Sequence, residues 1–510
     1  MRNFKLAIFA IITTLFLVQN CFAQEVWIND SRRRFAENSL QIYEINLRNF
    51  NATDTNNNGI IDFDDGEESG NFLNAIQRLD ELAESRINTI QLMPIMEVGK
   101  TKALGTAGSL YAPVSFNRLN PQLSSPNTAL SVEDQAIKFI NEAHRRRIRV
   151  IVEVPAFGSY DLYQRRPELF LKGNGTQSLI SAEYPDVRVF NTGSDGALNR
   201  EVLNLYRDYV DYVISLGVDG ISANLADTKP AKFWEELINY SRKKDPQFLW
   251  IAQSGTSSNI SQTAALTSND KLLSAGFDGV GILADYKNIK SARDFLNIVK
   301  SALAMKTKSP EGKAYFTNFV NHDTVSPILD GNAYYLDGIF WLNAVLPANS
   351  FMTDGLPSGD AFVYFWGNKK APKTYTDNST YFVHRGKMDI FNFSRKPGGN
   401  NTGLKEDYNN SNNFKYNAAN IYQAPDFNFE ELHTTSSDVF AFAISGGRYK
   451  IIAFGNVKKD MINDVKISVQ GLKEGFLPVP VKVHSIPKIE NGKISTSLLP
   501  YEVMVLAIEK

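Results

Sequence analysis

The sequence predicts an α/β fold: a (β/α)8 barrel with a small insertion after its third strand, followed by a C-terminal antiparallel β-sandwich. Between about residues 39 and 354, short apolar runs alternate with amphipathic segments of helical period, which is typical of repeated βα units around a parallel sheet. After residue 432, apolar runs follow one another without helical segments, which is typical of an antiparallel β-domain. The 510 residues, 43% of them hydrophobic, suffice for one large and one small domain.

Eight candidate strands occur in the first part of the chain, and eight is the number that closes such a barrel. Segments 70–84 and 131–147 carry apolar residues three and four positions apart, as expected for helices on the outside of a barrel. The stretch 157–199 is longer than an ordinary connection and predicts the insertion. The candidate strands are QIYEINL (41–47), INTIQLMPI (87–95), IRVIVEVPA (148–156), VDGISANL (218–225), FLWIAQS (248–254), FDGVGILA (277–284), AYFTNFVN (314–321) and SFMTD (350–354).

The end of the chain predicts a separate small domain. The stretch RKPGGNNTGLKEDYNNSNN (395–413) is rich in Gly, Asn and Lys and indicates an exposed loop. We therefore expect a barrel domain at 24–431 and a β-sandwich domain at 432–510. The strands expected in the second domain are DVFAFAI (438–444), YKIIAFGNV (449–457), DVKISVQ (464–470), VPVKVHSI (479–486), GKISTSLL (492–499) and YEVMVLAI (501–508).

The first 23 residues have the pattern of a secretory signal. Arg2 and Lys5 precede an apolar run at 6–18, and small residues precede a cut after Ala23. The run is too short to span a bilayer, so we expect no transmembrane anchor and an exported protein, periplasmic or extracellular. A lipid-anchored alternative would need a small residue before Cys21, the only cysteine, but Asn20 stands there.

The charge balance restricts the class of partner. The formal net charge is -1, and the chain has no long basic run. Nucleic acid and anionic membrane surfaces are therefore not expected as main partners, and a neutral substrate fits better.

Several motifs occur in the order in which the α-amylase family, glycoside hydrolase family 13, keeps its signatures. YEINLRNF followed by TDTNNNGIIDFDDGEESGNFLNAIQRLDEL is similar to that family's first strand, metal loop and first helix. GTAGSLYAPVSFNRLNPQL resembles the loop whose tyrosine lines the sugar site. The four short signatures of the family are matched in order by EAHRRRIRVIVEVPAF, SLGVDGISANLADTKPAKFW, FLWIAQSG and NFVNHD. The resemblance covers nearly the whole chain after the signal and implies α-glucan chemistry.

The resemblance also implies roles for particular positions. In the family, an aspartate after the fourth strand attacks the anomeric carbon, and a glutamate after the fifth protonates the leaving oxygen. One carboxyl group must form a covalent bond while the other gives and takes back a proton. Here the nucleophile position holds Asn224 and the acid position holds Gln253, while Ser222 replaces an arginine. The stabilising aspartate is retained as Asp323.

The other signature residues are partly retained. In the first motif Glu153 replaces an aspartate, and Phe157 and Gly158 replace an asparagine and a histidine. The motif around Asp323 is intact, and the family's sugar-stacking tyrosine is present. The resemblance therefore assigns substrate binding to Tyr111, Asn321 and His322.

A calcium ion is expected in the loop DTNNNGIIDFDD. Oxygen ligands at alternating positions around a glycine can wrap a hard cation, and the glycine permits the sharp turn. An Asn- and Gly-rich polar turn without an ion is the alternative. The expected ligands are the side chains of Asp54, Asn56, Asn58 and Asp62 and the carbonyl group of Ile60.

Three functions remain open from the sequence. The first is an exported α-amylase-like protein that binds starch-like or malto-oligosaccharide ligands with impaired catalysis. The second is a non-catalytic scaffold for a protein partner that the sequence does not identify. The third is an active hydrolase or transglycosylase that uses Asp227, Glu153 or Asp323 as non-standard carboxylates.

Overall fold

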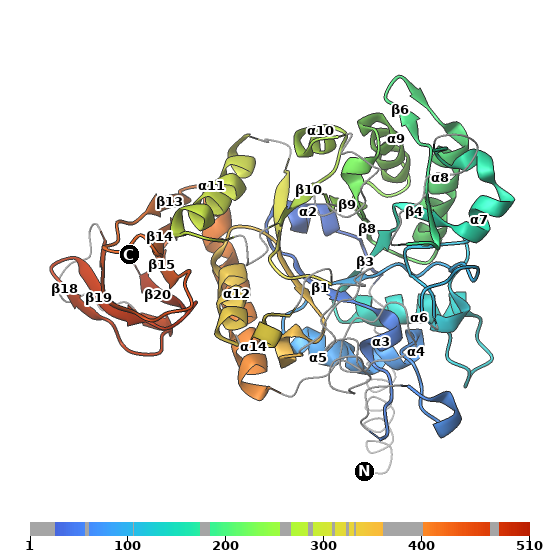
Figure 1. Cartoon of the computed structure of the whole chain (residues 1–510). Coiled ribbons are helices and arrows are strands. Elements are labelled where there is room, and N and C mark those ends of the chain that lie inside the picture. Colours follow the sequence, from blue (N-terminus) through green and yellow to red (C-terminus); the bar gives the residue numbers. More distant parts are fainter. Residues whose placement is uncertain are drawn as a thin grey trace, which may run out of the picture.

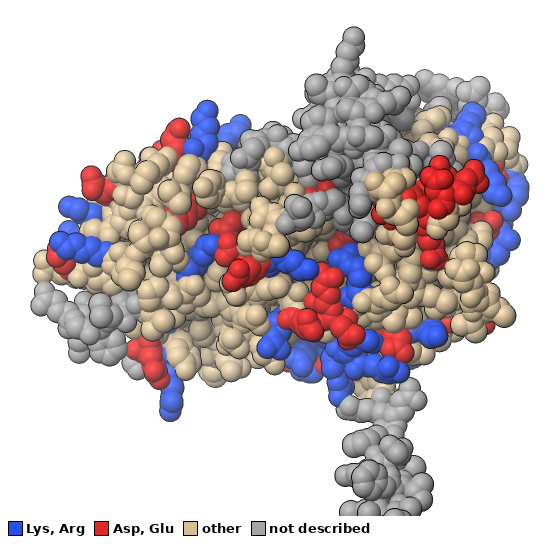
Figure 2. Space-filling view, turned by 90° about the horizontal axis from the view of Figure 1, so that it is seen from below, with Lys and Arg blue, Asp and Glu red and all other residues tan. Residues whose placement is uncertain are grey.

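The fold is seen in a computed structural model of the chain (Figure 1). The structure describes residues 26–56, 61–105, 107–173, 184–254, 267–283, 289–308, 312–322, 326–330, 333–360, 401–469 and 479–509. Among the helices in these ranges, none is long and apolar enough to cross a membrane. On the face shown in Figure 2, acidic and basic side chains lie side by side, as a near-neutral chain would lead one to expect.

The centre of the molecule is an eight-stranded parallel sheet. Its order is β11-β10-β9-β8-β3-β2-β1-β12, and a parallel bridge between Phe316 and Asn349 joins the two ends of this order. All eight predicted strands are therefore confirmed, as is the barrel. The strands are β1 (Gln41–Ile45), β2 (Thr89–Leu92), β3 (Arg149–Val154), β8 (Gly220–Ala223), β9 (Leu249–Ala252), β10 (Gly279–Leu283), β11 (Ala314–Asn318) and β12 (Ser350–Thr353).

Apolar side chains fill the interior of this sheet near its amino-terminal end. Ile42, Ile151 and Ile251 pack there with Phe316 and Phe351 in one buried cluster. Such filling makes a barrel a packed core and not a pore. At the carboxyl ends of the strands, polar side chains follow this apolar layer, and the candidate site lies there.

Helices cover the outside of the barrel (Figure 1). In α6 the Ser131 side chain accepts a hydrogen bond from the Asp134 amide and fixes the helix start. Apolar residues spaced by three and four then form its buried face, on which Phe139 contacts Phe72 of α4. The helices are α2 (Ser31–Ala36), α3 (Leu47–Phe50), α4 (Phe72–Ala75), α5 (Leu79–Glu84), α6 (Val132–Arg145), α7 (Tyr160–Arg165), α8 (Arg200–Ser215), α9 (Ala231–Arg242), α10 (Asn269–Ser274), α11 (Ala292–Lys308), α12 (Ala333–Val345) and α14 (Thr402–Gln423).

The insertion after β3 is a small irregular unit. Strand β4 (Phe157–Ser159) pairs with β5 (Val187–Val189) in antiparallel fashion, and α7 lies between them in the sequence. A second short pair, β6 (Gly193–Ser194) and β7 (Ala197–Leu198), precedes α8.

The predicted loop at 395–413 is wrong where the structure describes it, because helix α14 begins at Thr402. Asn401 caps the helix by accepting a hydrogen bond from the Leu404 amide. Leu404, Tyr408, Ile421 and others at helical spacing are buried. Packing of this face outweighs the low helix propensity of the many Asn residues, which dominated the sequence pattern.

The C-terminal strands form two antiparallel sheets, in the orders β13-β14-β15-β20-β17 and β16-β19-β18. Val439, Ile452, Ile467 and Ile494 belong to the core that the two sheets share. On the opposite face of the larger sheet, Phe440 contacts Phe295 of α11, with ring centroids 4.2 Å apart. The strands are β13 (Asn428–Glu431), β14 (Val439–Gly446), β15 (Tyr449–Asn456), β16 (Ile462–Ser468), β17 (Val479–Lys482), β18 (Lys488–Glu490), β19 (Lys493–Leu498) and β20 (Val503–Glu509).

Candidate active site at the carboxyl ends of the barrel strands

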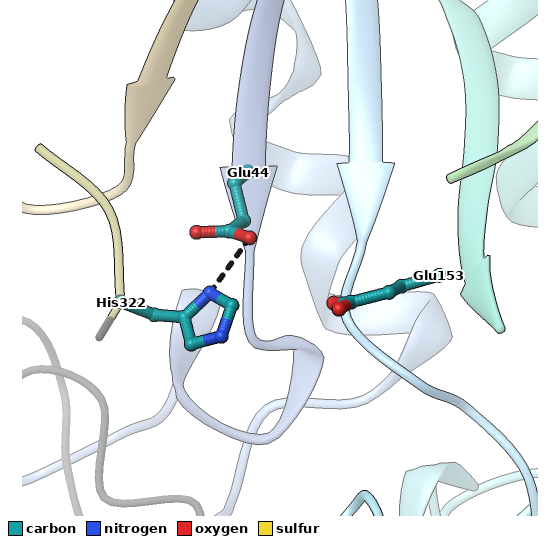
Figure 3. A group of neighbouring side chains, drawn as sticks. All are labelled: Glu44, Glu153 and His322. Carbon is teal, nitrogen blue, oxygen red and sulfur yellow. Dashed lines mark hydrogen bonds and ion pairs between the residues drawn. The ribbon is translucent and has the colours of Figure 1, made fainter. Parts of the chain in front are cut away.

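Polar residues from distant parts of the chain meet where the parallel strands end. Glu44 lies in β1 and Glu153 in β3, and His322 follows β11. Because the strands are parallel, their carboxyl ends share one end of the barrel, which is where catalytic residues of such barrels lie. Figure 3 shows the two carboxyl groups and the imidazole ring converging from three elements.

Glu44 holds His322 in place. His322 Nδ1 lies 2.8 Å from Glu44 Oε1 (Figure 3), and both side chains are buried. The Gln91 amide donates to the same carboxylate at 3.2 Å, and the Thr353 hydroxyl donates to its other oxygen at 3.0 Å. Both oxygens of Glu44 are thus hydrogen-bonded, which fixes the carboxylate beside the imidazole ring. Glu44 was not predicted from the sequence.

Tyr111 joins His322 to the second carboxylate. Its hydroxyl donates to Glu153 Oε2 at 2.8 Å and lies 3.1 Å from His322 Nε2. The Tyr111 and His322 rings also stack, with centroids 5.9 Å apart. The structure therefore brings the predicted sugar-stacking tyrosine to the site, but its side chain is buried.

The two predicted catalytic positions lie beside this network and carry amides. Asn224 follows β8, and its side-chain nitrogen donates to Glu153 Oε1 at 3.0 Å. Gln253 follows β9 and donates to the Ser222 hydroxyl at 3.0 Å. Asn224 and Gln253 are both partly exposed. Neither amide can serve as a carboxylate nucleophile or as a carboxylic acid, which are the groups that retaining hydrolysis requires.

The hydrogen bonds around His322 constrain its protonation. An ionised carboxylate only accepts hydrogen bonds, and a tyrosine hydroxyl has a single proton to donate. When Glu44 and Glu153 are ionised and Tyr111 donates to Glu153, both ring nitrogens of His322 must carry protons. The imidazolium then lies between two carboxylates, which balances part of their buried negative charge.

The same three residues could hold a metal ion. Among the described residues, Glu44, Glu153 and His322 offer ligand atoms that lie within 4.8 Å of one another. However, both ring nitrogens and both oxygens of Glu153 take part in the hydrogen bonds above. A cation would have to displace these hydrogen bonds, so the hydrogen-bonded arrangement competes with metal binding.

The expected calcium loop is described only in part. Asp54, Asn56 and Asp62 are described, whereas Asn58 and Ile60 lie outside the described residues. Glu67, which the sequence did not single out, is a buried carboxylate in this loop. It accepts hydrogen bonds from three backbone amides: that of Thr55 at 2.8 Å, that of Asp62 at 2.9 Å and that of Asn56. These backbone hydrogen bonds, that from Asp62 foremost, lower the pKa of Glu67.

The remaining predicted site residues are placed as follows. Asn321 is buried next to His322, and Asp323 lies outside the described residues. Asp227, the possible substitute carboxylate, is buried in the turn after β8.

Close in sequence to Asp227, the Lys229 ammonium donates to the Ala156 carbonyl at 2.9 Å. Burial lowers the pKa of Lys229 to about 7, against the opposing charge of Asp227. Nothing in the sequence pattern predicts this burial, because Lys229 stands in a short polar turn.

Comparisons with known proteins agree with this fold. No protein-family model matches the chain. In sequence, it is 24% identical over 260 residues to isoamylase 1 of Oryza sativa, covering 48% of this chain and 31% of that protein. It is also 27% identical over 210 residues to an α-1,4-glucan:maltose-1-phosphate maltosyltransferase of Bifidobacterium animalis, covering 38% of this chain and 28% of that protein. The aligned parts thus span about a third of these relatives.

Solved structures match over nearly the whole chain. A maltogenic α-amylase from Thermotoga neapolitana superposes with a TM-score of 0.66 at 19% identity, covering 93% of this chain and 99% of that one. An α-amylase from Lactobacillus plantarum gives a TM-score of 0.69 at 16% identity, with the same coverage. At such identities the superpositions show the fold. With the sequence relatives, they confirm the resemblance to the α-amylase family.

Proposed function

We propose that this chain is an exported protein of α-glucan metabolism. The proposal starts from its α-amylase-like fold and from the amides at both catalytic positions. The chain binds malto-oligosaccharides or starch-like chains at the carboxyl end of the barrel and does not hydrolyse them by the retaining mechanism. The fold and the α-glucan-processing relatives support the ligand class. The pattern at 1–23 supports export to a periplasm or to the cell exterior.

The observation that carries the proposal is the hydrogen bond from Asn224 to Glu153. Retaining hydrolysis needs a carboxylate that attacks and a carboxylic acid that protonates. Asn224 instead acts as a donor that satisfies one oxygen of Glu153 at 3.0 Å. Tyr111 occupies the other oxygen, so Glu153 is also not placed as a substitute nucleophile. The chemistry at this end of the barrel suits the recognition of hydroxyl groups.

Binding is supported by the polar groups that remain at the site. Asn224 and Gln253 are partly exposed, and an amide can both donate to and accept from a sugar hydroxyl. Ser222 and Glu153 hold these amides in fixed orientations, which reduces the entropy lost on binding.

We also propose a structural calcium ion in the loop around Asp54 and Asp62.

Product analysis after long incubation with maltoheptaose tests the absence of turnover. The mature chain, meaning residues 24–510, is expected to release no reducing ends even at high concentration. Turnover that the substitution Glu153→Gln abolishes would contradict the proposal and favour a hydrolase that uses a non-standard carboxylate. The double variant Asn224→Asp, Gln253→Glu is expected to stay inactive, because Ser222 stands where the family has an arginine.

Two phenylalanine variants test whether the ligand binds at this end of the barrel. Tyr111→Phe removes the hydroxyl that orients Glu153 and His322, and we expect weaker maltoheptaose binding. Tyr212→Phe is the matched control, because that hydroxyl donates to Glu133, away from the strand ends. Equal affinities of the two variants would place the ligand elsewhere.

A further inference from the structure

A polar cavity lies at the other end of the barrel, near the amino-terminal ends of the strands. Its volume is about 640 Å³. The segment before β1, the residues before β2 and β3 and the second half of α14 line it. This volume falls within the range of roughly 300 to 1,000 Å³ that small-molecule sites have. Gln41 at the start of β1 lines the cavity, whereas Glu44 of the same strand belongs to the site described above.

Basic side chains outnumber acidic ones in the lining of this cavity. Arg34, Arg147 and Arg149 face a single carboxylate, Asp30. Asp30 already pairs with Arg149 through a 2.7 Å hydrogen bond and with Arg34 at 3.2 Å. Although burial opposes it, the hydrogen bond and charge of Arg149 lower the pKa of Asp30, which therefore stays ionised. The balance of the lining is positive and favours an anionic ligand.

Two buried carboxamides also line the cavity. Asn38 and Gln41 are 4% and 2% exposed. The side-chain oxygen of each has no hydrogen-bond partner in the part of the chain that the structure describes. Both oxygens are closed to solvent, so a molecule in the cavity would meet the amide nitrogens of these side chains and not their oxygens. Further amides project from α14, namely Asn417, Asn420 and Gln423.

We propose that this cavity binds a small hydroxyl-rich anion, namely a sugar that carries a phosphate or a carboxylate group. The arginines would pair with the anionic group, because guanidinium groups form charge-assisted hydrogen bonds with phosphate and carboxylate oxygens. The amide nitrogens of Asn38 and Gln41 would donate hydrogen bonds to the hydroxyl groups. This site is separate from the candidate active site and does not depend on the function proposed for it.

Calorimetric titration of the mature chain tests this site. The probes are glucose 6-phosphate and glucuronate, with glucose and inorganic phosphate for comparison. Asn38 has a φ of 55° and Arg147 a φ of 61°, so Asn38→Gly and Arg147→Asn remove side chains while suiting the left-handed backbone. Lys102→Asn is the matched control, because Lys102 also has a φ of 61°, is exposed and lies outside the cavity.

The proposal predicts one molecule of glucose 6-phosphate or glucuronate per chain, bound more tightly than glucose or inorganic phosphate. Asn38→Gly and Arg147→Asn are each expected to weaken binding by about tenfold, the effect of losing one hydrogen bond to a charged or buried group. Lys102→Asn and Tyr111→Phe should leave it unchanged. If Asn38→Gly fails to fold, the exposed Asn420→Ala replaces it.

Three results would overturn the proposal. The first is no binding of either sugar anion at millimolar concentration. The second is inorganic phosphate binding as tightly as glucose 6-phosphate, which would mean an adventitious anion only. The third is equal affinity in Arg147→Asn and Lys102→Asn, which would place the anion outside this cavity.

Discussion

Glu153 is the residue on which the chemistry of the candidate active site depends. One of its oxygens accepts from Tyr111 and the other from Asn224, and its side chain is buried. An amide at position 224 suits this arrangement because it donates a hydrogen bond and adds no charge. An aspartate at position 224 would place its carboxylate beside that of Glu153, where the amide nitrogen now lies 3.0 Å from Oε1. Two like charges this close disfavour the ionised form of each other.

The substitution Asn224→Asp is therefore expected to destabilise the fold by about 1 to 3 kcal/mol at pH 7, the cost of an unpaired buried group. The repulsion raises the carboxyl pKa in the folded state, so the folded protein binds more protons than the unfolded chain above pH of about 4. Stability relative to the wild type should fall as the pH rises from about 4 to 7. Urea denaturation at both pH values measures this, and an equal deficit at both would contradict it.

Lys229 gives a second prediction at this scale. Its pKa is lowered to about 7 by burial, whereas a lysine in an unfolded chain titrates near pH 10.4. Between these values the unfolded chain binds the extra proton, so this residue makes stability rise with pH. We compare the free energy of unfolding of the wild type with that of Lys229→Met. The wild-type value minus the variant value should increase from pH 7 to pH 10. Lys232→Met, at an exposed position in α9, should show no such trend.

The sequence located most of the candidate site because signature residues stand at strand ends. It missed Glu44, although alternation in QIYEI places Glu44 on the same face as Ile42, which points into the barrel. A charged residue on that face was the available signal. The contacts of His322 could not be predicted, because its partners Tyr111 and Glu44 are distant in sequence.

At the scale of elements, strands were easier to predict than helices. The barrel strands are short apolar runs bounded by polar turns, and each occurs where the pattern predicts it. Helix α14 was missed because a Gly- and Asn-rich run directly precedes it and further Asn residues stand in its first half. Its buried face depends on contacts with α12 and β14, which are not evident from the sequence. Helix propensity is a weak guide where tertiary packing decides.

Two matched substitutions test the assignment of α14. Asn401→Ala removes the cap that accepts from the Leu404 amide, and should lower the free energy of unfolding by about 1 kcal/mol. Asn410→Ala changes the same residue type at an exposed position inside the helix, where alanine is the better helix former. It should leave stability unchanged or raise it by a few tenths of a kcal/mol. Equal losses in the two variants, measured by urea denaturation, would contradict this assignment.

At the scale of the whole molecule, the barrel and the sandwich share an apolar contact through α11, α12, α14 and the larger sheet. Phe295 and Phe440 lie at its centre, and Phe442 and Val503 belong to the same buried cluster as the barrel helices. The sandwich thus braces helices on the outside of the barrel. The candidate active site and the polar cavity lie at opposite ends of the barrel strands, so ligands could occupy both at once.

The central claim is that the barrel binds an α-glucan without cleaving it. Isothermal titration of residues 24–510 with maltoheptaose in calcium-containing buffer tests both parts of this claim at once. We predict a saturable isotherm in which the heat signal returns to baseline after each injection. Heat that continues after each injection would show turnover and contradict the roles assigned to Asn224 and Gln253, and the absence of any heat signal would contradict α-glucan binding.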